Sequence, residues 1–426
     1  MARRLRRRRL HPRRSTLLLL MVALLIVILV VRQLWEAYQF TATETGATID
    51  DAETTKAILM EQNSNFPSKD LIKERHPQRK KYNDDAPKLH VLPRRDQDNQ
   101  SSFSACLLVM DDNHFLIEWL AYHYHTLPLR YLVIAVDPRS RTSPQSILDR
   151  WASNMTITRW NDTHFLPQEW LNRGSKADDA TSKFVLHRER QRNFYPTCLQ
   201  ALKHAGRQWT TVVDIDEFVL INPHYLQYQN TTNTRVPKPT ILESIQSQAN
   251  YSQEACITMP RLRFGNYKDG NNATKSTLPN QYHDWMLTYR WQWRTGLHNR
   301  KVNRNPKSII NVGLVQNFSR ADTDAHRPVR SACPKRNMYI LNKQSPWSVH
   351  HYVGSREQFY FRKDARDGLK QRGPQRLAEY GHIREASDKS MLGWFEAFVQ
   401  VHGMAEAKRL IQGVGNVSYS ALLQSH

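Results

Sequence analysis

The stretch that most constrains the fold runs from Trp209 to Phe218 and reads WTTVVDIDEF. It begins as an apolar, β-branched run of strand length and ends in the carboxylates of Asp214, Asp216 and Glu217. Open α/β sheets bind their ligands at the carboxyl ends of such strands. The stretch therefore predicts a buried strand of an α/β domain with a polar site at its end.

The i, i+2 spacing of Asp214 and Asp216 suits one hard divalent cation. If the strand breaks after Asp214, both side chains can turn toward the same ion, which prefers oxygen ligands. Such a cation can hold the diphosphate of a nucleotide-sugar and neutralise the charge that develops as the diphosphate leaves. The alternative is an acidic run that simply ends a strand at the surface, because D-x-D alone is a weak motif. The apolar lead-in and the aromatic Phe218 favour the ion site.

The N-terminus predicts a membrane anchor. Residues 1–14 contain eight arginines and no acid, and residues 15–31 are uncharged and dominated by Leu, Val and Ile. A helix over residues 15–31 reaches about 25 Å, enough for a thin secretory-pathway bilayer. Arginines beside a span are retained in the cytosol, so residues 1–14 are expected to be a cytosolic tail and the chain after Arg32 to be luminal. A cleaved signal peptide is the alternative, although its apolar core is usually shorter and ends at small residues.

Charge and sequons bear on the partners. The formal charge is +22, and 22 − 8 leaves +14 once the eight arginines of the tail are removed. A basic body is compatible with nucleic acid, but a luminal domain does not meet it, so an acidic small substrate such as a nucleotide diphosphate is the expected partner. Simple solvated surface charge is the alternative. The eight N-x-[ST] sequons all follow the apolar run, in agreement with a luminal address: Asn99, Asn154, Asn161, Asn230, Asn250, Asn272, Asn317 and Asn416.

The chain has four cysteines, Cys106, Cys198, Cys256 and Cys333. In an oxidising lumen they can form two bridges, in any of three connectivities that the sequence does not distinguish. Zinc is not expected, because the C-x-x-C spacing is absent. Cys106 lies inside an apolar run, so a free buried thiol is the alternative for this residue.

Residues 101–426 are expected to form one domain after a polar stem at residues 32–100. The stem has no sustained apolar period, so it buries too little surface to offset the entropy of ordering. Ordered structure is expected to begin with a strand at Ala105–Met110, a helix at Phe115–Thr126 and a strand at Tyr131–Val136. This β-α-β unit carries acids at both strand ends, the layout that places ligands at the carboxyl edge of a parallel sheet.

Further elements are expected from local patterns. A helix is expected to begin at Pro196, a favoured first helical residue, and to end near Gly206. Residues 287–294 alternate large apolar with polar side chains, which predicts a strand whose aromatic face either stacks on a sugar ring or packs in the sheet. The remaining expected elements are strands at Met155–Trp160, Cys256–Phe264, Ser308–Val315 and Ser348–Val353 and an amphipathic helix at Met391–Val401.

Three segments resemble glycosyltransferase family 92 and its family-2-like relatives. Residues 111–123, DDNHFLIEWLAYH, resemble their N-E-x-x-x-L-x-E-W-x-x-(Y)-H opening, and Asp214–Phe218 resembles their D-x-D-E-F metal motif. His351–Phe359, HYVGSREQF, is similar to their late H-Y-x-x-K-S-x-E-x-F segment. The resemblance covers about residues 104–370. Asp111-Asp112 replaces Asn-Glu, and the late segment lacks the usual Lys before its Ser.

The resemblance implies a GT-A fold, which is one Rossmann-like α/β domain with a central mixed, mostly parallel sheet flanked by helices. It also implies a metal-dependent, inverting transferase that takes a UDP-sugar, with galactose favoured, to a glycan or glycoprotein acceptor. Together with the short apolar run, it places the chain in the Golgi membrane as a single-pass type II protein. The alternatives are a non-catalytic luminal glycan-binding protein and, less favoured, a luminal glycosidase, which would need two carboxylates across a sugar.

By the same resemblance, Asp216 and His351 would ligate Mn²⁺ or Mg²⁺, with Asp214 on the ribose or metal side. Asp112 and Asp137 would hold uridine or ribose, and Glu217 would orient its neighbours. The candidates for neutralising diphosphate charge are Lys307 and Arg300. The candidates for the general base that deprotonates the acceptor are Asp284 and Glu254.

Overall fold

The computed structural model describes residues 102–174, 180–228, 240–265, 286–299, 302–333, 342–354, 358, 361 and 383–414. All of them belong to the unit formed by residues 85–426. The expected cytosolic tail, apolar span and stem, residues 1–100, lie outside the described residues. Among the residues that are described, no helix has the length and apolar character needed to cross a membrane.

The first of two sheets has six strands in the order β3-β2-β1-β4-β9-β6. β3, β2, β1 and β4 run parallel, whereas β9 is antiparallel to both β4 and β6. The expectation of a mixed, mostly parallel sheet with flanking helices is therefore confirmed. The strands are β1 Phe103–Val109, β2 Leu129–Val136, β3 Thr156–Trp160, β4 Trp209–Val212, β6 Cys256–Met259 and β9 Lys307–Asn311.

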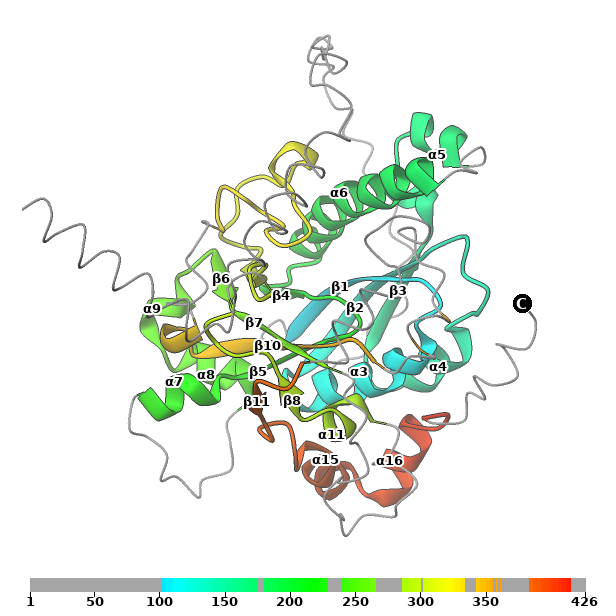
Figure 1. Cartoon of the computed structure of the whole chain (residues 1–426). Helices are drawn as coiled ribbons and strands as arrows, with labels where there is room; N and C mark the ends of the chain where they lie inside the picture. Colours follow the sequence, from blue (N-terminus) through cyan, green and yellow to red (C-terminus); the bar gives the residue numbers. More distant parts are fainter. Residues whose placement is uncertain are drawn as a thin grey trace, which may run out of the picture. The chain divides into compact units, whose positions relative to one another are not determined.

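The β-α-β unit predicted at the start of the domain is confirmed. Helix α3, Asn113–Thr126, connects the parallel strands β1 and β2. Side chains of β1 alternate between the two faces of the sheet, as the period of a strand requires. Leu107 packs in the core cluster that contains α3, whereas Cys106 packs in the cluster that contains helix α6, Ala180–His204. Figure 1 shows the sheet lying between these two helices.

Helix α6 is longer than the sequence indicates and contains Pro196 in its interior, so the expectation that it begins there is wrong. Proline lacks the N–H that would complete an intrahelical hydrogen bond, so the helix runs on at a local cost. Leu186, Phe194 and Tyr195 are buried in the core beneath α6. The free energy gained by burying these side chains offsets the cost of the proline, so the helix continues through Pro196.

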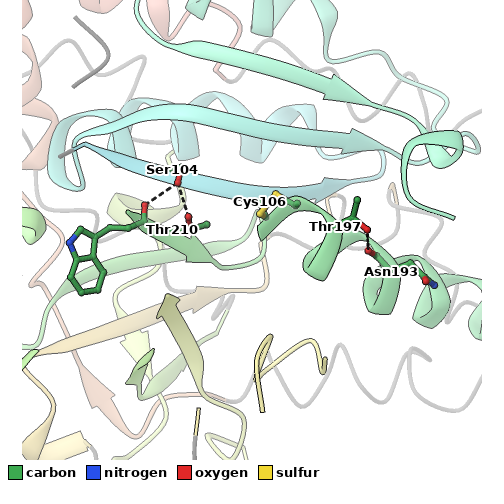
Figure 2. Close-up of a disulfide and its surroundings, with 7 residues drawn as sticks. Ser104, Cys106, Asn193, Thr197 and Thr210 are labelled. Atoms are coloured by element: carbon green, nitrogen blue, oxygen red, sulfur yellow. Dashed lines mark hydrogen bonds between the residues drawn. A yellow bond between two sulfur atoms is a disulfide. The ribbon is translucent and has the colours of Figure 1, made fainter. Parts of the chain in front are cut away.

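Two disulfides attach segments of the chain to strands of the first sheet. Cys106 of β1 is bonded to Cys198 of α6, and Cys256 of β6 is bonded to Cys333, so Cys106 is not a free thiol. Figure 2 shows the bridge from β1 to α6 and, beside it, the hydrogen bond between the hydroxyls of Ser104 and Thr210, 2.7 Å apart. The bridge and the hydroxyl pair tie β1 to α6 on one side and to β4 on the other.

The second sheet has five strands in the order β11-β8-β7-β10-β5. β10 is antiparallel to β5 and parallel to β7. The run Trp209–Phe218, expected as one strand, is divided between the sheets, since β4 ends at Val212 and β5 begins at Glu217. The strands are β5 Glu217–Ile221, β7 Arg261–Phe264, β8 Trp293–Arg294, β10 Trp347–Tyr352 and β11 Ala386–Ser387.

The strand expected over residues 287–294 is wrong for its first half, which forms helix α11, Leu287–Arg290. Glu118 of α3 supplies the reason. Its buried carboxylate accepts hydrogen bonds from the N–H of Leu287 (2.6 Å) and from the N–H and hydroxyl of Thr288 (3.1 and 2.6 Å). A carboxylate in this position satisfies N–H groups that a helix start leaves unpaired. Burial raises the pKa of Glu118 to about 7.

The C-terminal part of the described chain packs against the start of the domain. The amphipathic helix expected at Met391–Val401 is present as α15, Trp394–His402, which contacts α3, and it is followed by α16, Met404–Leu410, which contacts α4. The other elements are α4 Gln145–Trp151, η2 Asp162–His164, α5 Gln168–Gly174, α7 Pro223–Tyr228, α8 Ile241–Gln246, α9 Ala249–Ser252 and η4 Arg320–Asp322.

Candidate metal and donor site

Asp214 and Asp216 lie in the four-residue connection that carries the chain from β4 in the first sheet to β5 in the second. Two backbone hydrogen bonds fix this connection. The N–H of Glu217 donates to the carbonyl of Asp214 (3.0 Å), and the N–H of Tyr352 donates to the carbonyl of Asp216 (2.8 Å). The first bond makes a tight turn, and the second attaches the turn to the end of β10. The acids therefore sit where the two sheets meet.

One group of metal-binding atoms occurs at this position. Asp216, Glu217 and His351 each offer a ligand atom, and these atoms lie within 4.8 Å of one another. His351 Nε2 is 3.5 Å from Asp216 Oδ2. β10 places His351 directly across from Glu217, whereas the neighbouring His350 faces the opposite side of the sheet.

The ammonium of Lys307 lies between the carboxylates of Asp214 and Glu217. Its ammonium is 2.8 Å from Asp214 Oδ2 and 2.9 Å from Glu217 Oε2. The Lys307 side chain is 1% exposed, whereas that of Asp214 is 40% exposed. Burial alone would lower the pKa of Lys307, but the two carboxylates raise it above its ordinary value. For Asp214, desolvation acts in the raising direction, and the charge of Lys307 brings the pKa below its ordinary value. Both groups are therefore charged at neutral pH.

Glu217 is committed to neighbours through both of its oxygens. Oε1 accepts from Arg261 Nη1 of β7 (3.0 Å), and Oε2 accepts from the backbone N–H of Asp214 (2.8 Å) in addition to its contact with Lys307. The Glu217 side chain is completely buried. Glu217 thus orders the β4–β5 connection and balances two buried cations, which leaves it a poor candidate for direct metal ligation.

The described charges at the site are mixed. The three carboxylates of Asp214, Asp216 and Glu217 lie beside two buried cations, Lys307 and Arg261. Burial lowers the pKa of His351, which keeps its ring neutral and able to ligate a metal.

The distances also fit an ion. Two ligands that are each about 2.1 Å from a cation lie about 3 to 4 Å apart, depending on the angle between them. The 3.5 Å between His351 Nε2 and Asp216 Oδ2 falls within this interval. The other ring nitrogen, His351 Nδ1, is buried without a hydrogen bond from any described residue. The carboxylate suits Mn²⁺ or Mg²⁺, whereas an imidazole is a ligand more typical of transition-metal ions, so the pair favours Mn²⁺ over Mg²⁺.

Two residues of this environment carry no signal in the sequence. His326 lies in a loop, and burial, followed by the charges of Lys307 and Arg261, lowers its pKa to about 3. Burial, with the nearby negative charges of Asp214 and Glu217, raises the pKa of Tyr195 well above its ordinary value. Both residues reach Asp214 only through the tertiary fold, and neither belongs to a recognisable motif.

The E-W-x-x-Y-H segment of α3 holds strand β5, and therefore the acidic connection, in place. The indole N–H of Trp119 donates to the carbonyl of Glu217 (3.1 Å), and the hydroxyl of Tyr122 donates to the carbonyl of Val219 (2.8 Å). The N–H of Val219 donates to His123 Nε2 (3.2 Å). Burial lowers the pKa of His123 to about 3, so this nitrogen stays an acceptor. The two sequence motifs thus form one structural unit.

The end of β10 also packs against α3. Gly354 follows β10 and has a φ of +83°, in the left-handed region that favours glycine. A Cβ at this position would lie 2.9 Å from the Phe115 ring and 2.5 Å from the Gln358 side chain. The late segment of the resemblance therefore needs glycine here both for backbone conformation and for space.

Asp137 and Asp112, expected to hold uridine or ribose, are engaged with protein groups. Asp137 at the end of β2 is paired with Arg139 (2.8 Å) and with the buried Arg190, and its side chain is 1% exposed. Asp112 Oδ2 accepts from the N–H of Met110 (2.8 Å). Both carboxylates are buried, and in the described part of the chain they order the loops after β1 and β2.

The remaining four candidates are Lys307, Glu254, Asp284 and Arg300. Lys307 joins the site, but its charge is used by Asp214 and Glu217 and its burial keeps it from a diphosphate. Glu254 is exposed and precedes β6, and the Met259 end of β6 is the one that pairs with Lys307. The five residue steps from Glu254 to Met259 span about 16 Å of extended chain, so Glu254 is not brought to the site. Asp284 and Arg300 lie outside the described residues.

Comparison with the known protein families gives no match for this chain, and comparison with curated proteins gives no significant match either.

Proposed function

We propose that this chain is a metal-dependent glycosyltransferase of the GT-A type, which transfers a sugar from a UDP-sugar to a glycan or glycoprotein acceptor with inversion. The observation that carries the proposal is the pairing of Asp216 with His351 at the carboxyl end of β4, beside two further carboxylates. In open α/β sheets this edge is where nucleotides and their phosphates bind. Galactose is the sugar that the motif resemblance favours.

Asp216 and His351 would hold Mn²⁺ or Mg²⁺. When bound, the ion would neutralise the charge of the departing diphosphate. Asp214 has the most exposed of the three carboxylates, so we assign it to the ribose side of the donor. Glu217, Lys307 and Arg261 do not touch the donor in this account. They fix the β4–β5 connection, so that the ligands are positioned before the donor arrives.

An inverting transfer needs a base that removes the proton from the acceptor hydroxyl as the hydroxyl attacks the sugar. Of the two residues that the sequence suggests, Glu254 lies at the wrong end of β6. We therefore retain Asp284 as the candidate base. Replacing Asp284 by Asn should lower the rate of transfer and leave the binding of UDP unchanged.

We further propose that the catalytic domain is luminal and that residues 15–31 anchor it in the Golgi membrane. The two disulfides support a compartment of this kind, because disulfides persist in the oxidising secretory pathway and are rare in the cytosol. The four cysteines form two disulfides, so no cysteine has a free thiol. Protease protection of the domain in sealed microsomes would test this orientation.

The function is tested by thermal shift of the full chain with UDP and Mn²⁺ together and separately. The proposal predicts stabilisation that requires both ligands and is absent in Asp216→Ala, because the ion links the diphosphate to the protein. Glu254→Ala is the matched control and should respond like the wild type. Stabilisation by free glycans that ignores UDP would instead indicate a glycan-binding protein, and the transferase proposal would be abandoned.

A further inference from the structure

We propose that Lys307 acts as an internal cation that keeps Asp214 and Glu217 from ligating the metal. Of the described residues, this leaves Asp216 and His351 as the protein ligands, and a divalent ion binds well only together with a diphosphate. This inference rests on the proposed function, because it describes how the donor and the metal depend on one another at the same site.

The first argument is the position of the ammonium. Lys307 Nζ bridges Asp214 Oδ2 and Glu217 Oε2 at 2.8 and 2.9 Å, which is where a metal ion shared by these carboxylates would otherwise lie. β9 delivers the side chain from the strand beside β4, and burial keeps water from competing for it. Glu217 is further held by Arg261, so its release would break a second buried ion pair.

The second argument is the number of ligands that remain. Mg²⁺ is octahedral and usually takes one or two carboxylates from the protein, completing its shell with waters and substrate phosphates. With Asp214 and Glu217 engaged, Asp216 and His351 are the ligands that remain among the described residues. Two ligands give weak binding on their own, and two diphosphate oxygens would bring the total to four.

The third argument is the charge. The ammonium of Lys307 lies between the carboxylates of Asp214 and Glu217 and offsets part of their negative charge. It thereby weakens the attraction of these carboxylates for a divalent ion. Without Lys307 the freed carboxylates would attract the ion strongly. Because the diphosphate would supply ligands that the protein does not, each ligand should raise the affinity for the other by the same factor.

The experiment measures Mn²⁺ binding to the full-length, detergent-solubilised chain by calorimetry, alone and with UDP, GDP or UMP. For the wild type we expect weak Mn²⁺ binding that UDP strengthens by about tenfold or more, and that UMP, which lacks the second phosphate, leaves nearly unchanged. Lys307→Met should bind Mn²⁺ about tenfold more tightly without nucleotide and should show a smaller effect of UDP. Lys307→Arg, which keeps the charge, should resemble the wild type.

Removing Lys307 leaves two carboxylates without their cation, so Lys307→Met alone can fail to fold. The double variant Asp214→Asn/Lys307→Met removes one charge of each sign and serves as the second test. It should bind Mn²⁺ no more tightly than the wild type, because the carboxylate that Lys307 would release is absent. If the single variant does not fold, Mn²⁺ binding by the wild type without nucleotide as tight as with UDP overturns the inference.

The outcomes separate this inference from the function on which it rests. A folded Lys307→Met that gains no affinity for Mn²⁺ overturns the role of Lys307, even where UDP still strengthens metal binding by the wild type. Strengthening by GDP and not by UDP, with the gain in Lys307→Met, supports the role of Lys307 and rejects a UDP-sugar as the donor. Strengthening by UDP, with the gain in Lys307→Met, supports both.

Discussion

His350 and His351 are neighbours on β10, face opposite sides of the second sheet, and each lies beside an aspartate. His350 Nε2 is 3.9 Å from Asp388 Oδ2, and His351 Nε2 is 3.5 Å from Asp216 Oδ2. Two adjacent histidines of β10 thus each form a His–Asp pair, one on either face of the sheet. What differs is the charge around each pair.

The Asp388 pair is balanced. Arg294 Nε donates to Asp388 Oδ2 (2.9 Å), and the N–H and hydroxyl of Ser390 donate to Oδ1 (3.0 and 2.6 Å). Burial lowers the pKa of His350 to about 4, so its ring is neutral. One carboxylate and one guanidinium cancel, and the result is a buried network that attaches residues 383–390 to the second sheet.

The Asp216 pair belongs to a group of three carboxylates and two buried cations, next to the part-exposed carboxylate of Asp214. The comparison teaches that a His–Asp pair does not by itself indicate a metal site. Whether the surrounding cations match the carboxylates decides between a structural network and a place for an ion.

The largest effect should come from Asp216→Asn. The change removes a metal ligand, so we expect the rate of sugar transfer to fall about 10³-fold, which corresponds to about 4 kcal/mol of lost transition-state stabilisation. The melting temperature without metal should not fall, because the change relieves repulsion between acids. Initial rates with a UDP-sugar and Mn²⁺ measure the effect. If the variant retained a tenth of the wild-type rate, Asp216 would not be a required metal ligand, and the proposed difference between the two His–Asp pairs would be wrong.

Asp388→Asn should affect stability and leave the metal site alone. It strands the buried Arg294 without its carboxylate, and breaking a buried ion pair in this way costs about 3 kcal/mol. Denaturant unfolding of the variant measures this loss. Stabilisation of the folded variant by UDP with Mn²⁺ should match that of the wild type. Loss of the ligand response at full stability would reverse the roles that we assign to the two pairs.

His350 should make stability depend on pH. Its folded pKa of about 4 lies below the ordinary histidine pKa of 6.5, so the unfolded chain binds the proton more tightly, and stability falls as the pH falls from about 6.5 toward about 4. Between about pH 7 and about pH 5 this one group should cost about 2 kcal/mol. His350→Phe should flatten the pH dependence by that amount. Parallel curves for variant and wild type would show that His350 is not buried as a neutral ring.

The smallest effect should come from Tyr122→Phe, which removes one buried hydrogen bond to the carbonyl of Val219. We expect a loss of about 1 kcal/mol in the free energy of unfolding. Both His–Asp pairs should remain, because Trp119 and His123 still hold β5. Equal metal-dependent stabilisation of the variant and the wild type by UDP would check this. A specific loss of metal binding would indicate that Tyr122 positions Asp216 directly.

The sequence predicts those parts of the fold that local pattern determines. The β-α-β unit over β1, α3 and β2 follows from apolar periodicity, and the acids after β4 follow from the abrupt end of a β-branched run. The sequence also suggests that His351 joins Asp216, through the order of the motifs. These patterns can be recognised in the sequence alone, without knowledge of the tertiary contacts.

The rest depends on partners far apart in the chain. Residues 287–290 are helical because Glu118 meets them, and Pro196 lies inside α6 because buried aromatics extend that helix. The sequence offers Lys307 as a contact for diphosphate, whereas pairing of β9 with β4 places it between Asp214 and Glu217. No local pattern reports such contacts.

The most direct test of the metal site is anomalous diffraction from crystals of the protein grown with UDP and Mn²⁺. The account predicts one manganese peak within bonding distance of Asp216 and His351, about 2.1 Å from each ligand atom, with Lys307 still on Asp214. A peak between Asp214 and Glu217, or none near His351 despite bound UDP, would contradict it.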